Sequence, residues 1–317
     1  MRAQALSQQL PFTLDGTDFP ALGEKYQGKV RDTYARGDRL VLITTDRLSA
    51  FDHVLTTLPF KGDLLNTLAH FWFKKTGHVV KNHVLDMPDP CVTVAKKAEP
   101  YKVEFVVRGY LTGSLWRDYE KATDPYGLRL PAGLKKDSIF PTPLLTPSTK
   151  APKGEHDLPL SEADVVSKGL LSARDLQEAK EATLALFAAG QAHAKTRGLI
   201  LVDTKYEFGK VDGKLTLIDE MHTPDSSRFW EASEYEARYA RGEPQLMLDK
   251  ENLRQWLINE RGFSGHGPLP QIPDEVRVSL TEKYLTAYER ITGTEFALKP
   301  GSVRDRLAGN LRAAKLI

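Results

Sequence analysis

The sequence LILVDTKYEFGKVDGKLTLIDEMHTPDSSRFW, residues 199–230, predicts a β-hairpin. Two short apolar runs, Leu199–Val202 and Leu215–Ile218, flank a connection that contains Asp212-Gly213. β-rich runs separated by a short connection with glycine are typical of paired antiparallel strands. The hairpin is therefore the element around which the other segments are placed.

Three ionisable residues, Asp203, Lys205 and Glu207, alternate along the first strand of this hairpin. Because successive side chains of a strand point to opposite faces, the three share one face. The length of the turn decides which acid of the return strand joins them. A two-residue turn would place Glu220 there, and a three-residue turn would place Asp219 there. We expect the three-residue turn, with Gly213 at its left-handed last position, which makes Glu207 and Asp219 diagonal neighbours.

Two carboxylates this close need a cation between them or must shift their pKa values. A solvent-facing strand would show the same charges, but here they are followed by Pro224-Asp225-Ser226-Ser227-Arg228, a loop with two hydroxyls and an arginine. The combination favours a phosphate site in which Glu207 and Asp219 hold Mg²⁺ against the phosphates of a substrate.

The composition excludes several classes of protein. The chain has 317 residues, of which 41% are hydrophobic and 27% charged, with a net charge of +2. These values are near those of globular proteins and give no indication of a nucleic-acid-binding surface. The single cysteine excludes an intrachain disulfide. No segment has the apolar length of a signal peptide core or a membrane span, so we expect a cytoplasmic protein.

The segment Gly23–Val30 has the glycine and lysine spacing of a P-loop but ends in Val30, where serine or threonine would bind Mg²⁺. The residues that follow alternate as a strand, and residues 39–45 look like its hairpin partner across Gly37. This context argues against a P-loop. One alternative is a glycine turn between two strands that covers the phosphates of a nucleotide, with Lys29 nearby. The simpler alternative is a plain hairpin with no role in binding.

A second anion-binding pattern follows the predicted strand Val103–Val107. Arg108 and Gly109 end this strand, and Thr112, Gly113 and Ser114 come next. Arginine beside glycines and hydroxyls suits an anion, although a helix capped at Ser114 explains these residues equally well. Residues 124–168 are rich in proline, glycine and lysine, and we expect a long substrate-facing loop there.

The remaining segments predict helices that serve packing. Asp63 is a plausible N-cap of a helix that ends near Gly77, and Ser172 begins a helix that leads into the hairpin. After Trp230 the chain is mostly helical, over residues 249–262, 274–293 and from 302 onward. We expect no chemistry from these last segments.

Seven blocks, in this order, resemble the SAICAR synthetase (phosphoribosylaminoimidazole-succinocarboxamide synthase) family: GKVRDTY, TTDRLSAFD, KGDLLN, EFVVRGYLTGS, TPSTKAPKGEHD, LVDTKYEFG and IDEMHTPDSSRFW. They cover about residues 28–230. The loop block and the helical tail resemble the longer, eukaryotic-like form of that family. The resemblance implies an ATP- and Mg²⁺-dependent ligase of purine biosynthesis. Its substrates are carboxyaminoimidazole ribonucleotide and L-aspartate, and its products are SAICAR, ADP and phosphate.

The resemblance also implies roles for individual residues. Nucleotide binding falls to Gly28, Lys29, Val30, Glu207 and Asp219, of which Glu207 and Asp219 hold Mg²⁺; the strand Val103–Val107 lies near the adenine. The imidazole nucleotide is bound by Arg108, Ser114 and Arg228, with Ser49 and Asp52 as further substrate contacts. Asp203 and Lys205 lie between the two substrates and act in catalysis. Neither the aspartate-binding residues nor the oligomeric state, monomer or dimer, follows.

The implied fold is α+β, related to the ATP-grasp and kinase-like group. A small antiparallel β subdomain, residues 1–105, covers ATP, and a larger α+β part, residues 106–317, carries the hairpin, with ATP in the cleft between them. Two other functions fit the same residues: a small-molecule kinase that needs no L-aspartate, and a non-catalytic nucleotide-binding module. The presence of Lys205, Glu207 and Asp219 argues against the module.

Overall fold

The computed structural model describes residues 2–150, 156–248 and 250–317. Its strands are β1 (Glu24–Gln27), β2 (Arg31–Arg36), β3 (Arg39–Thr44), β4 (Arg47–Ala50), β5 (His53–Thr57), β6 (Val84–Asp89), β7 (Val92–Lys96), β8 (Glu99–Tyr110), β9 (Ile139–Leu145), β10 (Ser148–Thr149), β11 (Leu199–Val211), β12 (Lys214–Ile218) and β13 (Ser227–Glu231). Its α-helices are α1 (Arg2–Gln9), α2 (Lys61–Thr76), α3 (Gly113–Glu120), α4 (Glu162–Ser167), α5 (Ala173–Thr196), α6 (Ala232–Arg241), α7 (Glu251–Arg261), α8 (Asp274–Thr292) and α9 (Val303–Ala313).

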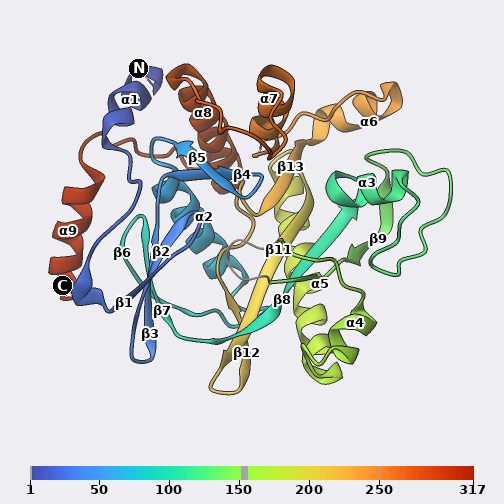
Figure 1. The fold of residues 1–317 in the computed structure, drawn as a ribbon, viewed down its shortest axis with the longest axis horizontal. Helices are drawn as coiled ribbons and strands as arrows, with labels where there is room; N and C mark the ends of the chain where they lie inside the picture. The colour runs from blue at the N-terminus through green and yellow to red at the C-terminus, as the bar shows by residue number, and fades with distance from the viewer. Residues whose placement is uncertain (1, 151–155, 249) are drawn as a thin grey trace.

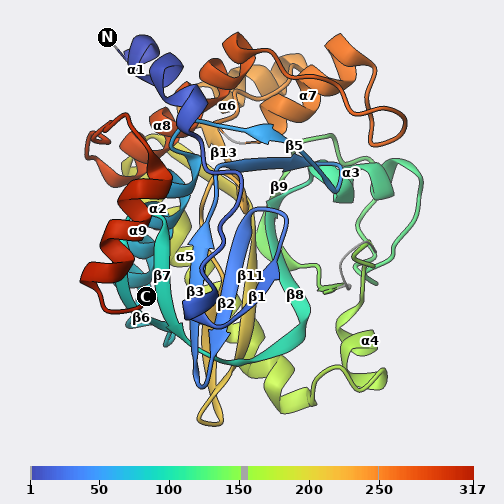
Figure 2. The ribbon, with the colours of Figure 1, turned by 60° about the vertical axis from the view of Figure 1, so that its left-hand side comes forward.

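The strands form two main antiparallel sheets, which confirms the expected α+β class. The first has the order β1-β2-β3-β7-β6, and the second has the order β10-β8-β11-β12, with β13 on β11 and β9 on β8. The long strands β8 and β11 run side by side through the middle of the molecule (Figure 1). A separate hairpin, β4-β5, lies above the first sheet in the view of Figure 2. In the described ranges no helix has both the length and the apolar character needed to cross a membrane.

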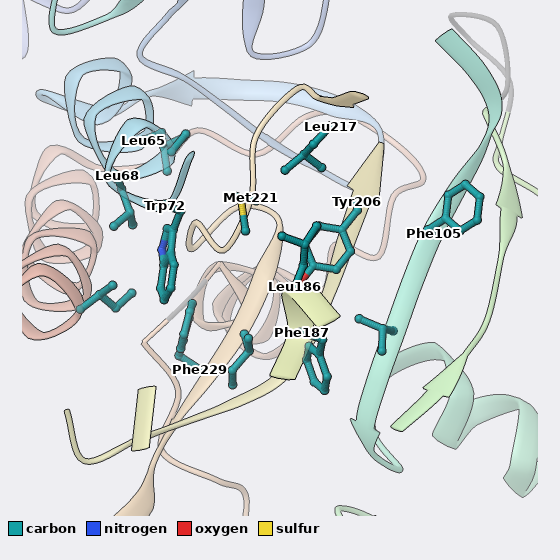
Figure 3. Packing of buried hydrophobic residues seen from close by; sticks show 14 of the residues in the cluster. Leu65, Leu68, Trp72, Phe105, Leu186, Phe187, Tyr206, Leu217, Met221 and Phe229 are labelled. Carbon is teal, nitrogen blue, oxygen red and sulfur yellow. The ribbon is translucent and has the colours of Figure 1, made fainter. Parts of the chain in front are cut away.

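The largest hydrophobic core lies between the second sheet and helices α2, α5 and α8. Trp72 of α2, Phe187 of α5 and Tyr206 of β11 are fully buried in it (Figure 3). Tyr206 and Phe208 point into this core, whereas Lys205 and Glu207 point to the opposite face of β11. Burying each large apolar side chain contributes about 1.5–3 kcal/mol. A slip by one residue would exchange the two faces, so the core fixes where the charged side chains point.

A second core connects the two ends of the described chain. Helix α9 lies against the first sheet, and its Val303, Leu307 and Leu311 pack with Tyr34 and Ile43. Figure 2 shows α9 beside β6 and β7. The chain thus returns at its end to the sheet formed near its beginning.

Arginine 306 of α9 fastens this helix to α2 and β6. Its guanidinium donates to both carboxylate oxygens of Asp63, at 2.6 and 2.7 Å, and to Asp89 at 3.1 Å. Asp63 is therefore not the N-cap that the sequence suggested: α2 begins at Lys61, and Asp63 lies in its first turn. Burial raises the pKa of Asp63, and Arg306 opposes that rise. In the described ranges, Asp63, Asp89 and Cys91 are the one group of three possible metal ligands, and Arg306 occupies the space between the two carboxylates.

The β11–β12 hairpin differs from expectation in its turn. Val211 pairs with Lys214, so the turn has two residues, Asp212 and Gly213, with φ of +52° and +71°. These angles match the type I′ turn, whose twist suits a tight hairpin. The expected three-residue turn is wrong, and Glu207 lies opposite Ile218.

Candidate active site

Two neighbouring cavities open along the charged face of β8 and β11. The larger, here called the cleft, has a volume of about 560 Å³ and lies between the first sheet, the β1–β2 turn and the second sheet. The smaller, here called the basic pocket, has a volume of about 280 Å³. Both volumes are in or near the range of small-molecule sites in proteins.

The floor of both cavities is one ladder of paired residues. Glu207 lies opposite Glu104, Lys205 opposite Val106, and Asp203 opposite Arg108. Glu104 and Glu207 line the cleft, and Arg108 and Asp203 line the basic pocket. Lys205 lines both cavities. The predicted shared face of Asp203, Lys205 and Glu207 is confirmed.

Lys205 is held between two acids. Its Nζ lies 2.6 Å from Glu104 Oε1 and 3.1 Å from Glu207 Oε1, and Glu207 also pairs with Lys150. Burial alone would lower the pKa of Lys205, but Glu207 and Glu104 raise it above its usual value, so the ammonium stays charged. Burial would raise the pKa of Glu207, yet Lys205 and Lys150 bring it to about 2. The site therefore holds ionised groups of both signs at neutral pH.

Asp219 also lines the cleft, although not for the reason expected from the hairpin register. It follows the last residue of β12 and has a φ of +67°, a left-handed conformation that turns the chain after the strand. Arg31 of β2 pairs with Asp219 and also with Glu220, at 3.1 Å. Glu207 and Asp219 therefore face a common cavity, as predicted, through a bend at Asp219 rather than through strand pairing.

The glycine turn between β1 and β2 covers the cleft. Gly28, Lys29 and Val30 all line it, and the turn joins two antiparallel strands, so the rejection of a P-loop is confirmed. Arg47 of β4 holds this turn in place, because its guanidinium donates to the carbonyl oxygens of Gly28 and Lys29 at 3.1 and 3.0 Å. Arg47 is nearly fully buried and also pairs with Asp32 at 2.8 Å.

The lining of the cleft suits a nucleotide. Its apolar residues include Val30, Leu40, Leu42, Ala98, Pro100 and Ile218, and its charged residues include Lys29, Arg31, Lys150, Lys205, Glu104, Glu207 and Asp219. An apolar surface can accept a base, while the cations and carboxylates can accept phosphates with a divalent ion. Of the strand Val103–Val107, Glu104 lines the cleft, whereas Val106 lines the basic pocket.

The basic pocket is lined by the predicted anion-binding residues. Arg108 donates to Ser114 Oγ at 3.0 Å and to Asp203 at 3.4 Å, and Arg228 pairs with the same Asp203. Gly113 begins α3 with a φ of +61°, and a Cβ atom there would collide with the Arg228 guanidinium. The sequence alternative of a helix capped at Ser114 is wrong in its cap: α3 begins at Gly113, Thr112 takes the N-cap position without a side-chain cap bond, and Ser114 Oγ accepts from Arg108 instead.

Two predicted substrate contacts lie elsewhere. Ser49 is buried in β4, and Asp52 lies in the β4–β5 turn with a φ of +64°. Neither is among the described residues that line the cleft or the basic pocket. Asp52 pairs with Lys29, and His156 Nδ1 lies 2.7 Å from the same carboxylate. The described end of the long loop thus contacts the turn beside the cleft; residues 151–155 of that loop lie outside the described residues.

Several lining residues did not follow from the sequence. Lys250 and Arg254, beside and within α7, line the basic pocket, although this segment was expected to serve packing. Arg31 and Lys150 line the cleft. The position of Arg31 directly after the glycine turn could have predicted that it lines the cleft. The approach of α7 to the basic pocket could not be predicted, because it depends on tertiary packing that no local pattern encodes.

Comparisons with known proteins identify the family of this chain. The family model described as SAICAR synthetase matches residues 24–266. A phosphoribosylaminoimidazole-succinocarboxamide synthase of Legionella pneumophila (strain Lens) is 44% identical over 311 residues, which cover 96% of this chain and 99% of the relative. A relative of this length is therefore bacterial, so the longer form is not confined to eukaryotes.

Solved structures give the same result. The SAICAR synthase from Saccharomyces cerevisiae in complex with SAICAR matches with a TM-score of 0.79 and 32% identity, over 90% of this chain and 100% of that chain. A SAICAR synthetase (Type-2) in complex with ADP matches with a TM-score of 0.67 and 27% identity, over 86% and 100% of the two chains. The extent of the family match and the near full-length identity lead to one conclusion: the chain belongs to the SAICAR synthetase family.

Proposed function

We propose that the cleft binds ATP with Mg²⁺ and that the basic pocket binds the imidazole nucleotide, with Lys205 between them. The enzyme is an ATP-dependent ligase of purine biosynthesis. It joins L-aspartate to the carboxylate of carboxyaminoimidazole ribonucleotide and forms SAICAR, ADP and phosphate. The observation that carries the assignment of the two cavities is that Lys205 lines both of them.

The reaction has two steps. An oxygen of the imidazole carboxylate attacks the γ-phosphorus of ATP, the bond from that phosphorus to the bridging oxygen breaks, and an acyl phosphate and ADP form. The amine nitrogen of L-aspartate then attacks the acyl carbon, the bond to the phosphate oxygen breaks, and the nitrogen loses a proton. Both steps bring anions together, so the protein contributes mainly positioning and charge neutralisation.

The position of each residue on the β8–β11 ladder determines its proposed role. The Lys205 ammonium neutralises charge on the phosphoryl group as it passes from the cleft to the basic pocket. Asp203 holds the guanidinium groups of Arg108 and Arg228, which, with Ser114, bind the phosphate and ribose of the nucleotide. Paired arginines in a fixed geometry match the oxygens of a phosphate. Gly28, Lys29 and Val30 cover the phosphates of ATP, whereas Ser49 and Asp52 stay predictions as substrate contacts.

The residues of the cleft fit a Mg²⁺ ion. Glu207 and Asp219 offer carboxylate oxygens, the ligands Mg²⁺ prefers, and both face one cavity. Lys150, Lys205 and Arg31, which pair with them, are cations that the phosphates of ATP can attract away. Mg²⁺ commonly takes one or two carboxylates and completes its shell with phosphates and water, so no protein cage is needed. When bound, the ion offsets the negative charge of the phosphates.

Four further expectations from the sequence belong to this proposal. The partners are small molecules, namely ATP, the imidazole nucleotide and L-aspartate. A cytoplasmic location stays a prediction. The boundary between a clamping subdomain, residues 1–105, and the remainder, residues 106–317, stays a prediction, as does the choice between monomer and dimer.

ADP release with and without L-aspartate tests the function. We expect sustained release only when ATP, Mg²⁺, the imidazole nucleotide and L-aspartate are all present, with one SAICAR formed per ADP. Full turnover without L-aspartate would instead identify a small-molecule kinase, and the absence of any turnover despite ATP binding would identify a nucleotide-binding module. For substitutions of Lys205 the matched control is Lys210→Met, because Lys210 also lies on β11 but pairs with Asp175 outside both cavities.

A further inference from the structure

A tyrosine and a histidine form a hydrogen bond in the core, on the side of β11 opposite the charged face. Tyr206 lies between Lys205 and Glu207 in the sequence, but its side chain points into the core (Figure 3). Its hydroxyl is hydrogen-bonded to His222 Nε2, and both side chains are fully buried. Polar groups that are buried in a core need such partners. The position of His222 in the chain indicates what this pair does.

His222 lies in the segment that runs from one cavity to the other. Asp219, three residues earlier, lines the cleft, and Pro224, two residues later, lines the basic pocket. Asp219 and His222 have φ values of +67° and +51°, and such left-handed conformations cost free energy in residues other than glycine. They persist only where the surrounding contacts over-determine them. The shape of this segment therefore depends on the contacts of its buried side chains.

Three elements enclose the imidazole ring of His222. The ring of Trp72, on α2, meets it edge-on with the ring centres 4.6 Å apart, and the ring centre of Tyr206, on β11, lies 5.4 Å from it. Gly190 lies within α5, and a Cβ atom there would collide with the imidazole. Glycine is unfavourable inside a helix, so the space that His222 needs explains its presence at this position. The ring is thus confined by α2, α5 and β11.

The imidazole depends on Tyr206 for its hydrogen bonding. Burial lowers the pKa of His222 to about 3, so the ring is neutral at physiological pH. Among the residues that the structure describes, its Nδ1 has no partner, and the bond to Tyr206 is the one hydrogen bond that the ring makes. Loss of the tyrosine hydroxyl would leave a buried polar ring unpaired, which favours a shift of the segment that brings the ring to water.

We propose that Tyr206 and His222 are positioning residues for Asp219. Their hydrogen bond ties the segment that carries Asp219 to the strand that carries Glu207, and so holds the two carboxylates where both can bind Mg²⁺. The inference rests on the proposed function, because it takes these carboxylates as the metal ligands. Arg31 also pairs with Asp219, but it is one of the cations that the phosphates of ATP can attract away. Once Arg31 turns to the phosphates, the carboxylate has to be held from the core.

Calorimetric binding of ADP to Tyr206→Phe, with and without Mg²⁺, tests the proposal. The ratio of the two affinities measures what the metal contributes, independently of turnover. We expect this ratio to fall by about 3- to 10-fold in the variant, the loss that corresponds to one neutral hydrogen bond, while the affinity for ADP without Mg²⁺ changes less than about twofold. Tyr101→Phe is the matched control, because Tyr101 belongs to the same core and its hydroxyl has no partner among the described residues. This control should keep both affinities.

A purely structural role of the pair would lower the melting temperature of Tyr206→Phe and leave the ratio unchanged, and that result would overturn the proposal. An equal loss of affinity with and without Mg²⁺ would overturn it as well, because it would show a general distortion of the cleft. Failure of the proposed metal site would appear separately, as a wild type whose affinity for ADP does not respond to Mg²⁺.

Two substitutions of His222 decide the question if Tyr206→Phe does not fold. Glutamine at this position can hydrogen-bond the hydroxyl of Tyr206, whereas leucine has a similar size and cannot. We therefore expect His222→Gln to keep the ratio of the two ADP affinities within about twofold of the wild type and His222→Leu to lower it by the same factor as Tyr206→Phe. Equal ratios in the two variants would refute the positioning role.

Discussion

The substitution Lys205→Met removes the ammonium between the two cavities and keeps an unbranched side chain of similar length. We expect kcat to fall by about 10²–10³, because a fixed charged donor at a developing negative charge contributes about 2.7–4 kcal/mol. The assay is coupled ADP release at saturating concentrations of all three substrates. The Lys210→Met control, on the same strand, should keep kcat.

The same variant has a characteristic pH dependence of stability. In the wild type the pKa of Glu207 in the folded chain is about 2, below the unfolded value of about 4.3, so this carboxylate stabilises the fold above pH 4 and loses that effect as the pH falls toward 2. Without Lys205, Glu207 and the directly opposite Glu104 repel each other with Lys150 alone to offset them, so the pKa values of both carboxyls rise relative to the wild type. A raised carboxyl pKa means that the folded state takes up the proton more readily. The deficit of the variant in free energy of unfolding should therefore be largest near pH 7 and shrink toward pH 4.

Two results would refute this reasoning. One is a kcat within about tenfold of the wild type with unchanged KM values, which would mean that the Lys205 ammonium does not stabilise the phosphoryl group in the transition state. The other is a stability deficit that stays constant between pH 7 and pH 4, which would mean that Glu104 and Glu207 do not interact across the ladder. Thermal or urea unfolding of the unliganded proteins measures the second quantity.

Three other substitutions test separate parts of the structure. Asp219→Asn should lower Mg²⁺-dependent turnover by about 10²-fold or more while the melting temperature stays within a few degrees; near-normal turnover across a Mg²⁺ titration would contradict the metal assignment. Arg228→Ala should raise the KM for the imidazole nucleotide by about 10- to 100-fold, measured by initial rates, and an unchanged constant counts against a phosphate contact. Arg306→Ala should cost about 3–5 kcal/mol, or about 5–8 °C in melting temperature, because two buried carboxylates lose their cation. Arg304→Ala, on the exposed side of the same helix, should change little by calorimetry, and equal losses would refute the role of burial.

Much of the site could be predicted because it depends on local geometry. The alternation of Asp203, Lys205 and Glu207 requires only that residues 203–207 form a strand, and Tyr206 and Phe208 fix which face of that strand packs into the core. The hairpin β2–β3 and the helix that begins after Ser172 follow from turn and cap chemistry in the same way. Such features depend on residues only a few positions apart.

The errors occurred where two solutions were close in energy or where distant segments meet. Gly213 fits the last position of either a two- or a three-residue turn. The two-residue turn requires a positive φ at Asp212, and the sequence alone does not fix the sign of φ at an aspartate. The arrival of Lys250 at the basic pocket depends on how α7 packs against the loop at Pro224. No pattern within α7 indicates this contact, and so the segment was expected to have no part in the chemistry.

The docking of α9 on the first sheet has a consequence for synthesis of the chain on the ribosome. Tyr34 and Ile43 are made more than 260 residues before their packing partners Leu307 and Leu311. Until then the face of β2 and β3 on which α9 packs stays exposed to water, and transiently exposed apolar surface of this kind promotes aggregation. The first sheet, which borders the cleft, is thus translated long before the helix that covers it, so a ribosome that stalls before residue 303 releases a chain whose first sheet has an uncovered apolar face.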